Sequence, residues 1–165
     1  YMLEPEVYSF RLLDALIKEA SRRGVTSFPV HIKIDTGMNR LGFEPEDMPE
    51  ICRRVKSQGG LVVRSVFSHL AGSDSPELDD FTKKQIEVYS EAASVLEGGL
   101  GYPVLKHILN SAGIERFPEF QKDMVRLGIS LYGVSASGEA ESLQSVCSLK
   151  TIILQIRNVP AGDSI

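Results

Sequence analysis

Helix-like and strand-like segments alternate along most of this chain, and this alternation constrains its fold more than any other feature. Residues 9–23 place apolar side chains every three or four positions, and residues 45–60 and 81–97 also read as helices. Between and after them lie "PVHIKI", "LVVRSVFSHL" and "PVLKHILN", which are typical of short strands. Strands that alternate with helices over short connections form parallel β-α units. The sequence therefore predicts an α/β fold with a parallel sheet.

The chain changes character after the third of these strands. "SAGIERFPEF" reads as a short helical turn, and "MVRLGISLYG" as two brief strand pieces around Gly128. Small and polar residues follow at 135–141, and "SLKTIILQIRNV" then reads as one long strand with no helix after it. We therefore expect one domain over residues 1–136 and the start of a second, β-rich domain over residues 142–165.

Length and charge exclude several classes of protein. The 165 residues suit one domain, whereas a complete eight-stranded α/β barrel needs about 250 residues. The chain starts without Met and stops just after a strand-like run, so we expect a piece of a longer protein. A net charge of −4 without basic clusters argues against a nucleic-acid partner, and no apolar run approaches the roughly 20 residues of a membrane span. Without a signal peptide, we expect a cytoplasmic protein.

Polar side chains collect where the predicted strands end. Ligands of parallel α/β folds bind at the carboxyl ends of the strands. Four successive segments end in such residues: Lys33, Asp35 and Arg40; Ser68 and His69; Asn110 and Ser111; and Arg126, followed by Gly128. Any one of these ends alone would mean little, but four of them on one rim predict a site.

Each residue also has a structural interpretation. Lys33 could be solvated or paired with Asp35, and a lone His69 is more often a core histidine. Ser111 could cap the short helix after it while Asn110 makes a turn, although a helix start with a hydroxyl also binds phosphate. Arg126 is the hardest to dismiss, because an unpaired arginine is costly to bury in a strand. Three further residues are interpreted as structural or as pocket wall: His31, His107 and Met38.

Other types of site fit less well. A zinc site built from His31, His69 and Asp35 would lack any familiar ligand spacing, so we expect no metal. A serine hydrolase would need a GxSxG elbow, and nucleotide sites would need a GxGxxG or Walker-type loop; the sequence has none of them. What remains is an anion site with two arginines and a lysine facing a helix-end serine.

Five segments in this order and spacing closely resemble alanine racemase: "HIKIDTGMNRLGF", "FSHLAGSD", "HILNSAG", "DMVRLGISLYG" and "SLKTIILQIRNVPAGDS". The resemblance covers the chain from about Val7 onward. It implies an enzyme that interconverts L- and D-alanine for peptidoglycan with pyridoxal 5'-phosphate, acting as a head-to-tail homodimer. The family fold is an eight-stranded (β/α)8 TIM barrel followed by a β domain. This chain would hold the later half of the barrel and the first strand of that domain.

The resemblance also implies roles for individual residues. Lys33 matches a lysine that is often carbamylated and then orients Arg40, and Arg40 matches the arginine near the phenolic oxygen of the cofactor. His69 matches a histidine beside the pyridine ring, and Arg126 the arginine facing the ring nitrogen. The expected cofactor-binding set is Arg40, His69, Asn110, Ser111, Arg126, Gly128 and Ile129, the last two through their backbone N–H groups.

The resemblance places both catalytic bases outside this chain. The family's Schiff-base lysine precedes Tyr1 and its catalytic tyrosine follows Ile165, so Lys33, Arg40, His69 and Arg126 would act in supporting roles. Racemisation needs a base on each face of the α-carbon, so we expect the chain alone to be inactive. The parent could be fused to a ligase that adds D-Ala-D-Ala. The alternatives are a non-catalytic pyridoxal-phosphate barrel, another racemase or aldolase of the same fold, and a structural scaffold.

Overall fold

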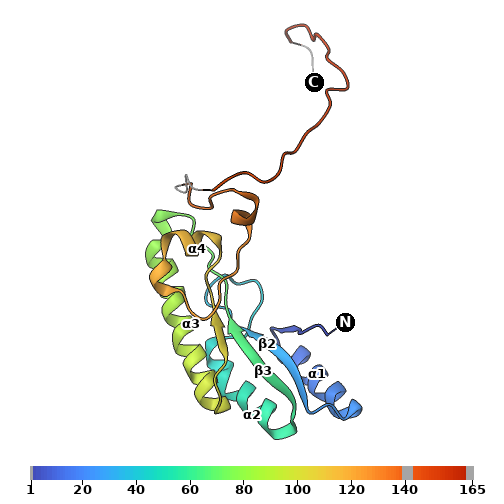
Figure 1. Cartoon of the computed structure of the whole chain (residues 1–165), viewed down its shortest axis with the longest axis vertical. Coiled ribbons are helices and arrows are strands. Elements are labelled where there is room, and N and C mark those ends of the chain that lie inside the picture. Colours follow the sequence, from blue (N-terminus) through green and yellow to red (C-terminus); the bar gives the residue numbers. More distant parts are fainter. Residues whose placement is uncertain (1, 139–142, 163–165) are drawn as a thin grey trace.

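A parallel sheet of four strands forms the centre of the fold (Figure 1). The computed structural model describes residues 2–138 and 143–162. The strands follow one another in chain order across the sheet: β1 (Glu6–Val7), β2 (Ser27–Lys33), β3 (Gly60–Phe67) and β4 (Leu105–His107). Each neighbouring pair is parallel. This confirms the predicted α/β class, although the two-residue β1 was not expected.

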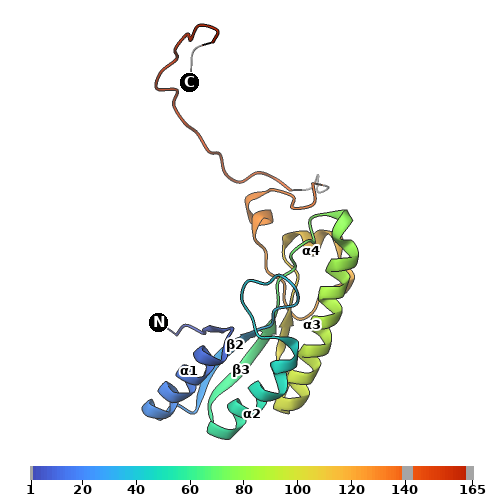
Figure 2. The same cartoon turned by 180° about the vertical axis from the view of Figure 1, so that it is seen from behind.

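Three long helices lie along one face of this sheet (Figures 1 and 2). They are α1 (Phe10–Arg23), α2 (Met48–Gln58) and α3 (Asp79–Leu100). The short helix α4 (Ser111–Arg116) follows β4 and lies at the carboxyl end of the strands. Short 3-10 turns complete the elements: η1 (Pro45–Asp47), η2 (Pro76–Leu78), η3 (Pro118–Phe120) and η4 (Ile129–Tyr132). No helix in the described part of the chain is long and apolar enough to cross a membrane.

Local sequence explains where the first helix begins and ends. Ser9 caps α1 by accepting a hydrogen bond from the N–H of Leu12, and Gly24 ends the helix in a left-handed conformation. Leu13 and Ile17 lie one turn apart on the buried side of the helix. The predicted helix over residues 9–23 is therefore confirmed.

The core lies between the sheet and these helices. Ile32 and Ile34 are fully buried toward it, together with Tyr89 of α3, whose hydroxyl donates to the carbonyl of Val66. Lys33 lies between the two isoleucines in sequence and therefore points to the opposite face. We call this opposite face, which carries Lys33, Ser65, Phe67 and His107, the polar face of the sheet.

Helix α3 runs past the glycines that we expected to end it. Gly98 and Gly99 lie inside the helix, and Gly101 ends it in a left-handed conformation. A Cβ at Gly99 would lie 2.6 Å from Sγ of Cys52 on α2. The glycine therefore serves close packing of two helices and does not stop the helix.

Two strand predictions were wrong. Residues 124–128 have no regular structure and residues 129–132 form η4, so no strand surrounds Gly128. Residues 148–159, expected as a long strand, run exposed and unpaired away from the sheet (Figures 1 and 2). A strand needs a hydrogen-bonded neighbour, and the described residues offer this segment none. The predicted domain boundary falls partly on residues 139–142, and the outer ends of both predicted domains on residues 1 and 163–165, all outside the described residues.

Candidate functional site

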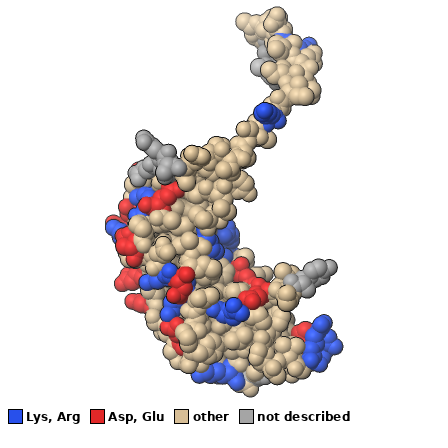
Figure 3. Space-filling view, in the orientation of Figure 1, with Lys and Arg blue, Asp and Glu red and all other residues tan. Residues whose placement is uncertain are grey.

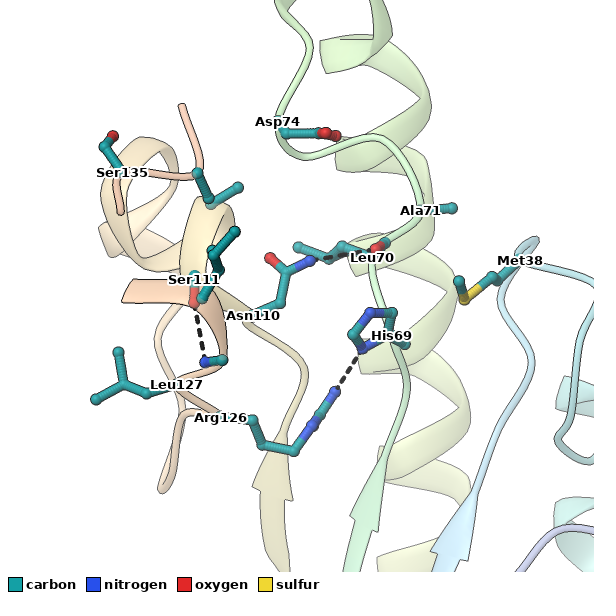
Figure 4. A pocket seen from close by; sticks show the side chains of 14 residues that line it. Met38, His69, Leu70, Ala71, Asp74, Asn110, Ser111, Arg126, Leu127 and Ser135 are labelled. Carbon is teal, nitrogen blue, oxygen red and sulfur yellow. Dashed lines mark hydrogen bonds between the residues drawn. The ribbon is translucent and has the colours of Figure 1, made fainter. Parts of the chain in front are cut away.

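The polar strand ends come together around two adjoining hollows at the carboxyl end of the sheet. The first has a volume of about 610 Å³ and includes Ser111, Gly128 and Ile129 in its wall (Figure 4). The second, of about 440 Å³, includes Lys33 and Arg40. Two residues line both hollows, His69 and Arg126. The volume of the first hollow is in the range of small-molecule sites.

Arg126 is the centre of the polar contacts between the hollows. Its Nη1 donates to Nδ1 of His107 at 2.6 Å, and its Nη2 donates to the carbonyl of Ser68 at 2.6 Å. Nη2 also reaches Nδ1 of His69 at 3.3 Å (Figure 4). The guanidinium lies 5.1 Å from the centre of the Phe67 ring, a cation–π distance. These acceptors supply the partners that a half-buried arginine needs, and none of them is a carboxylate.

Both histidines beside Arg126 are held neutral. Burial lowers the pKa of His107 to about 4, and the positive charge of Arg126 adds to this effect. Burial also lowers the pKa of His69, with further contributions from the charges of Arg126, Arg40 and Lys33. Because Arg126 donates to Nδ1 of His69, the ring proton of the neutral His69 is assigned to Nε2. His69 thus offers a hydrogen-bond donor from this nitrogen.

Asp35 organises the loop that carries Arg40. Its carboxylate accepts hydrogen bonds from the backbone N–H groups of Gly37, Asn39 and Arg40, at 2.8, 3.1 and 3.0 Å. Partial burial acts to raise the pKa of Asp35, but these backbone donors outweigh it and the pKa is lowered. Asp35 is therefore a loop anchor, and the described contacts do not pair it with Lys33.

Lys33 is buried on the polar face and faces a different carboxylate. Its Nζ lies 3.6 Å from Oε1 of Glu6 on β1 and 5.7 Å from the centre of the Phe67 ring. Basic and acidic side chains lie beside each other on the concave side of the molecule in the space-filling view (Figure 3). The ammonium of Lys33 is thus directed into the second hollow.

Ser111 and the chain after Arg126 form a group of hydrogen-bond donors in the first hollow. The hydroxyl oxygen of Ser111 accepts from the N–H of Gly128 at 2.9 Å and from that of Ser130 at 3.4 Å. Gly128 and Ile129, the expected N–H contributors, both line this hollow, and the N–H of Gly128 donates to Ser111 in this structure. The hydroxyl proton of Ser111 and the nearby Arg126 are suited to an anion, and the two N–H groups now bonded to Ser111 lie in the same place.

Asn110, and not Ser111, caps helix α4. Its Oδ1 accepts from the N–H of Gly113 at 2.9 Å and from the hydroxyl of Ser73 at 2.9 Å. Its Nδ2 donates to the carbonyl of Leu70. Asn110 thus ties the loop after β3 to the start of α4, which leaves the hydroxyl of Ser111 directed toward Gly128.

Three further residues support the site, and no sequence motif marks them as site residues. Nδ1 of His107 accepts a hydrogen bond from Arg126. Gln85 of α3 is buried and contacts the loops after β2 and β3. The carboxylate of Glu115 accepts from the hydroxyl of Ser130 and from backbone and side-chain groups of residues 135–137. His107 was interpreted as structural from sequence; only its position one strand away from His69 could have indicated more.

Comparisons with known proteins agree on one family. A sequence model described as "Alanine racemase, N-terminal domain" matches residues 1–136. "Alanine racemase 1" of Oceanobacillus iheyensis is 38% identical over 164 residues, which are 96% of this chain and 43% of that protein. An alanine racemase structure from Clostridium difficile 630 aligns with a TM-score of 0.73 at 31% identity, over 86% of this chain and 36% of that one.

A further solved structure shares the fold at lower identity. The alanine racemase from Bartonella henselae, with covalently bound pyridoxal phosphate, gives a TM-score of 0.73 at 23% identity, over 87% of this chain and 38% of that one. The chain spans about two fifths of the length of the curated relative from Oceanobacillus iheyensis. The match to barrel structures over this length confirms the expectation of a partial α/β barrel.

Proposed function

This chain belongs to the alanine racemase N-terminal domain family, and from that membership we propose that the full protein interconverts L- and D-alanine with pyridoxal 5'-phosphate as its cofactor. The product would be D-alanine for peptidoglycan, made in the cytoplasm by a homodimer. The chain covers less than half of its relatives, so these statements concern the protein of which the chain is a part.

The observation that carries this proposal is the position of Arg126 between two neutral histidines, next to the donors around Ser111. The guanidinium stays protonated at any working pH and can only donate. The wall of the first hollow therefore offers donors to two kinds of acceptor. One set, around Ser111 and Gly128, suits a phosphate, and Arg126 suits a ring nitrogen that carries a lone pair.

The donor set of this site fits pyridoxal phosphate. Ser111, Gly128 and Ile129 would hold the phosphate, with Asn110 fixing the helix start behind them. Arg126 would donate to the pyridine nitrogen and keep that nitrogen unprotonated, and His69 would lie beside the ring. Arg40 would face the phenolic oxygen. Carbamylation of Lys33 would turn its cation into an anion, and that anion would orient Arg40.

When bound, pyridoxal phosphate withdraws electrons from the α-carbon of the amino acid. A ring nitrogen that receives a hydrogen bond without a proton makes this withdrawal weaker. With Arg126 at the ring nitrogen, the negative charge at the α-carbon would be stabilised less strongly. A proton would then return to the α-carbon in preference to side reactions. The residues of this chain bind and orient; the proton transfers themselves need a base on each face of the α-carbon.

We propose that both bases come from outside this chain. Lys33 is the one lysine among the described residues that line the two hollows, and its ammonium faces Glu6. Lys106 instead bonds Glu97 of α3. The chain alone is therefore expected to be inactive, and the length of the full protein tests whether a ligase is fused to the racemase.

The test compares the full-length protein with this chain, each given pyridoxal phosphate and L-alanine. We expect formation of D-alanine and visible absorbance of a lysine-bound cofactor in the full-length protein, and neither in the chain alone. Cofactor absorbance without D-alanine would favour a non-catalytic pyridoxal-phosphate protein. Lysine-bound cofactor in the chain itself would overturn the assignment of the missing lysine.

Arg126→Lys is the sharpest variant for this proposal. Lysine keeps the positive charge but cannot reach His107, Ser68 and His69 at once. We expect kcat of the full-length protein to fall by at least about tenfold, which corresponds to roughly 1.4 kcal/mol. Arg53→Lys, on the exposed side of α2, is the control and should leave kcat unchanged.

A further inference from the structure

One line of hydrogen bonds crosses the polar face of the sheet from Arg126 to the segment before β1. It passes through His107 on β4, Ser65 on β3 and His31 on β2, and ends at Glu4. The four distances in this order are 2.6, 3.2, 2.6 and 2.9 Å. The ladder between β2 and β3 skips Arg64, and the shifted register places His31 opposite Ser65.

The first link decides the state of His107. Arginine has only donors, so Nδ1 of His107 must accept and cannot carry a proton. His107 is neutral at pH 7, because burial and the charge of Arg126 lower its pKa to about 4. Its one ring proton is therefore assigned to Nε2, which donates to Oγ of Ser65.

The hydrogen bonds of Ser65 run in the same donor-to-acceptor direction toward His31 on β2. The hydroxyl oxygen of Ser65 accepts from His107, so its single proton is free for Nδ1 of His31 at 2.6 Å. His31 in turn donates from Nε2 to the carboxylate of Glu4. Ser65 is fully buried. If His31 carried its proton on Nδ1 while His107 kept its own on Nε2, both rings would donate to Ser65 and the hydroxyl proton would have no acceptor among these partners, at a cost in free energy.

We propose that Ser65, together with His31, is a positioning residue that holds His107 in its Nε2–H form and so fixes the guanidinium of Arg126 in the site. With the proton on Nδ1, His107 would point a donor at the donor of Arg126 across 2.6 Å. The stacking of His107 on Phe67, at 4.9 Å and 5°, orients the ring but does not choose between its nitrogens. Arg126 requires the Nε2–H form of His107, and Ser65 with its partner His31 stabilises that same form by accepting its hydrogen bond.

The expected effect of this hydrogen-bond line on catalysis rests on the proposed function. The expected proton positions on His107 and Ser65 do not. We expect Arg126 to swing away from its position whenever His107 takes the Nδ1–H form. The proton positions can therefore be tested without cofactor, and the rate with it.

The first experiment labels the histidines of the full-length protein with ¹⁵N and identifies the protonated ring nitrogen by NMR at pH 7, without cofactor. We expect one Nε2–H form of His107 in the wild type. Ser65→Ala and His31→Leu should each give a mixture of the two forms, and Ser65→Thr, which restores the hydroxyl, should return the single form.

Ser90→Ala is the matched control, since among the described residues the hydroxyl of Ser90 bonds the Ile86 carbonyl of its own helix and nothing else. It should leave the signals of His107 unchanged. An Nδ1–H or charged His107 in the wild type would overturn the proposal. A single Nε2–H form that survives in both Ser65→Ala and His31→Leu would overturn it equally.

The second experiment adds pyridoxal phosphate and alanine. Ser65→Ala should lower kcat about tenfold with a smaller change in KM, and Ser65→Thr should recover most of it. If the ring protons respond as expected but no variant and no wild type forms D-alanine, the proposed function fails and this inference stands. If the wild type racemises alanine but the protonated ring nitrogen of His107 does not change in Ser65→Ala and His31→Leu, the inference alone fails.

Discussion

Gln85, in the first half of α3, holds the backbone of Ala71 in the loop after β3. The N–H of Ala71 donates to Oε1 of Gln85 at 2.9 Å. The Nε2 of Gln85 donates to Oγ1 of Thr36 and to the carbonyl of His69, both at 3.3 Å. One buried amide thus joins the loops that carry Arg40 and His69.

Gln85→Leu should loosen the loop after β3. The N–H of Ala71 would lose its partner, at a cost of about 1–3 kcal/mol. We expect the amide of Ala71 to exchange with deuterium at least about tenfold faster, because local opening becomes easier. Gln85→Glu keeps the acceptor and should keep most of the protection. Unchanged exchange in Gln85→Leu would show that the contact is dispensable.

Gly42→Ala should be among the most damaging single-methyl changes in the chain. A Cβ at Gly42 would lie 2.3 Å from the backbone nitrogen of Asp35, and its φ of +142° is strained for any other residue. We expect a large drop in Tm or loss of the folded protein. Gly98→Ala is the control: it lies inside α3 with open space around it and should stabilise the helix by about 0.5–1 kcal/mol.

Stability should fall on acidification because of His107. In the folded state burial lowers the pKa of His107 to about 4, whereas in the unfolded chain this pKa has its ordinary value of 6.5. Between these values the unfolded state holds more protons, so lowering the pH favours unfolding, by up to about 2 kcal/mol at pH 5. His107→Gln can mimic the neutral ring without titrating. Tm should therefore drop less between pH 7 and 5 in this variant than in the wild type.

Glu115→Ala should release the segment after η4. The carboxylate accepts from the N–H groups of Ala136 and Ser137, at 3.3 and 3.1 Å. Burial acts to raise the pKa of Glu115, but the hydroxyls of Ser137 and Ser135 and these amides lower it to about 2. We expect both amides to exchange faster in the variant and not in Glu119→Ala, an exposed control. Equal exchange in both variants would contradict this role.

The sequence predicted the sheet, the three long helices and the rim, because each rests on local patterns. Ser9 and Gly24 mark the ends of α1, and alternation correctly placed Ile32 in the core and Lys33 on the other face. Arg126 lies next to His69 as the predicted rim required, although the strand that was expected to carry Arg126 does not form.

What the sequence could not supply are contacts between distant segments. Lys33 faces Glu6, which is 27 positions away, and not the nearby Asp35 that its sequence suggested. Ser65 looks like an ordinary strand serine until the sheet places it between two histidines. Residues 148–159 have the composition of a strand, but a strand also requires a neighbour that the chain's own described residues do not provide.

Arg126 keeps its charge among neutral acceptors, and this affects how fast a ligand arrives as well as how tightly it is held. The 165 residues of this chain carry a net charge of −4, which repels an anion at long range. At the second hollow, three cations (Arg126, Lys33 and Arg40) outnumber two carboxylates (Glu4 and Glu6), so the local charge attracts an anion. Salt screens the long-range repulsion before it screens the short-range attraction. Moderate ionic strength should therefore speed the capture of a phosphate-bearing ligand, which is the opposite of its usual effect on a positively charged site.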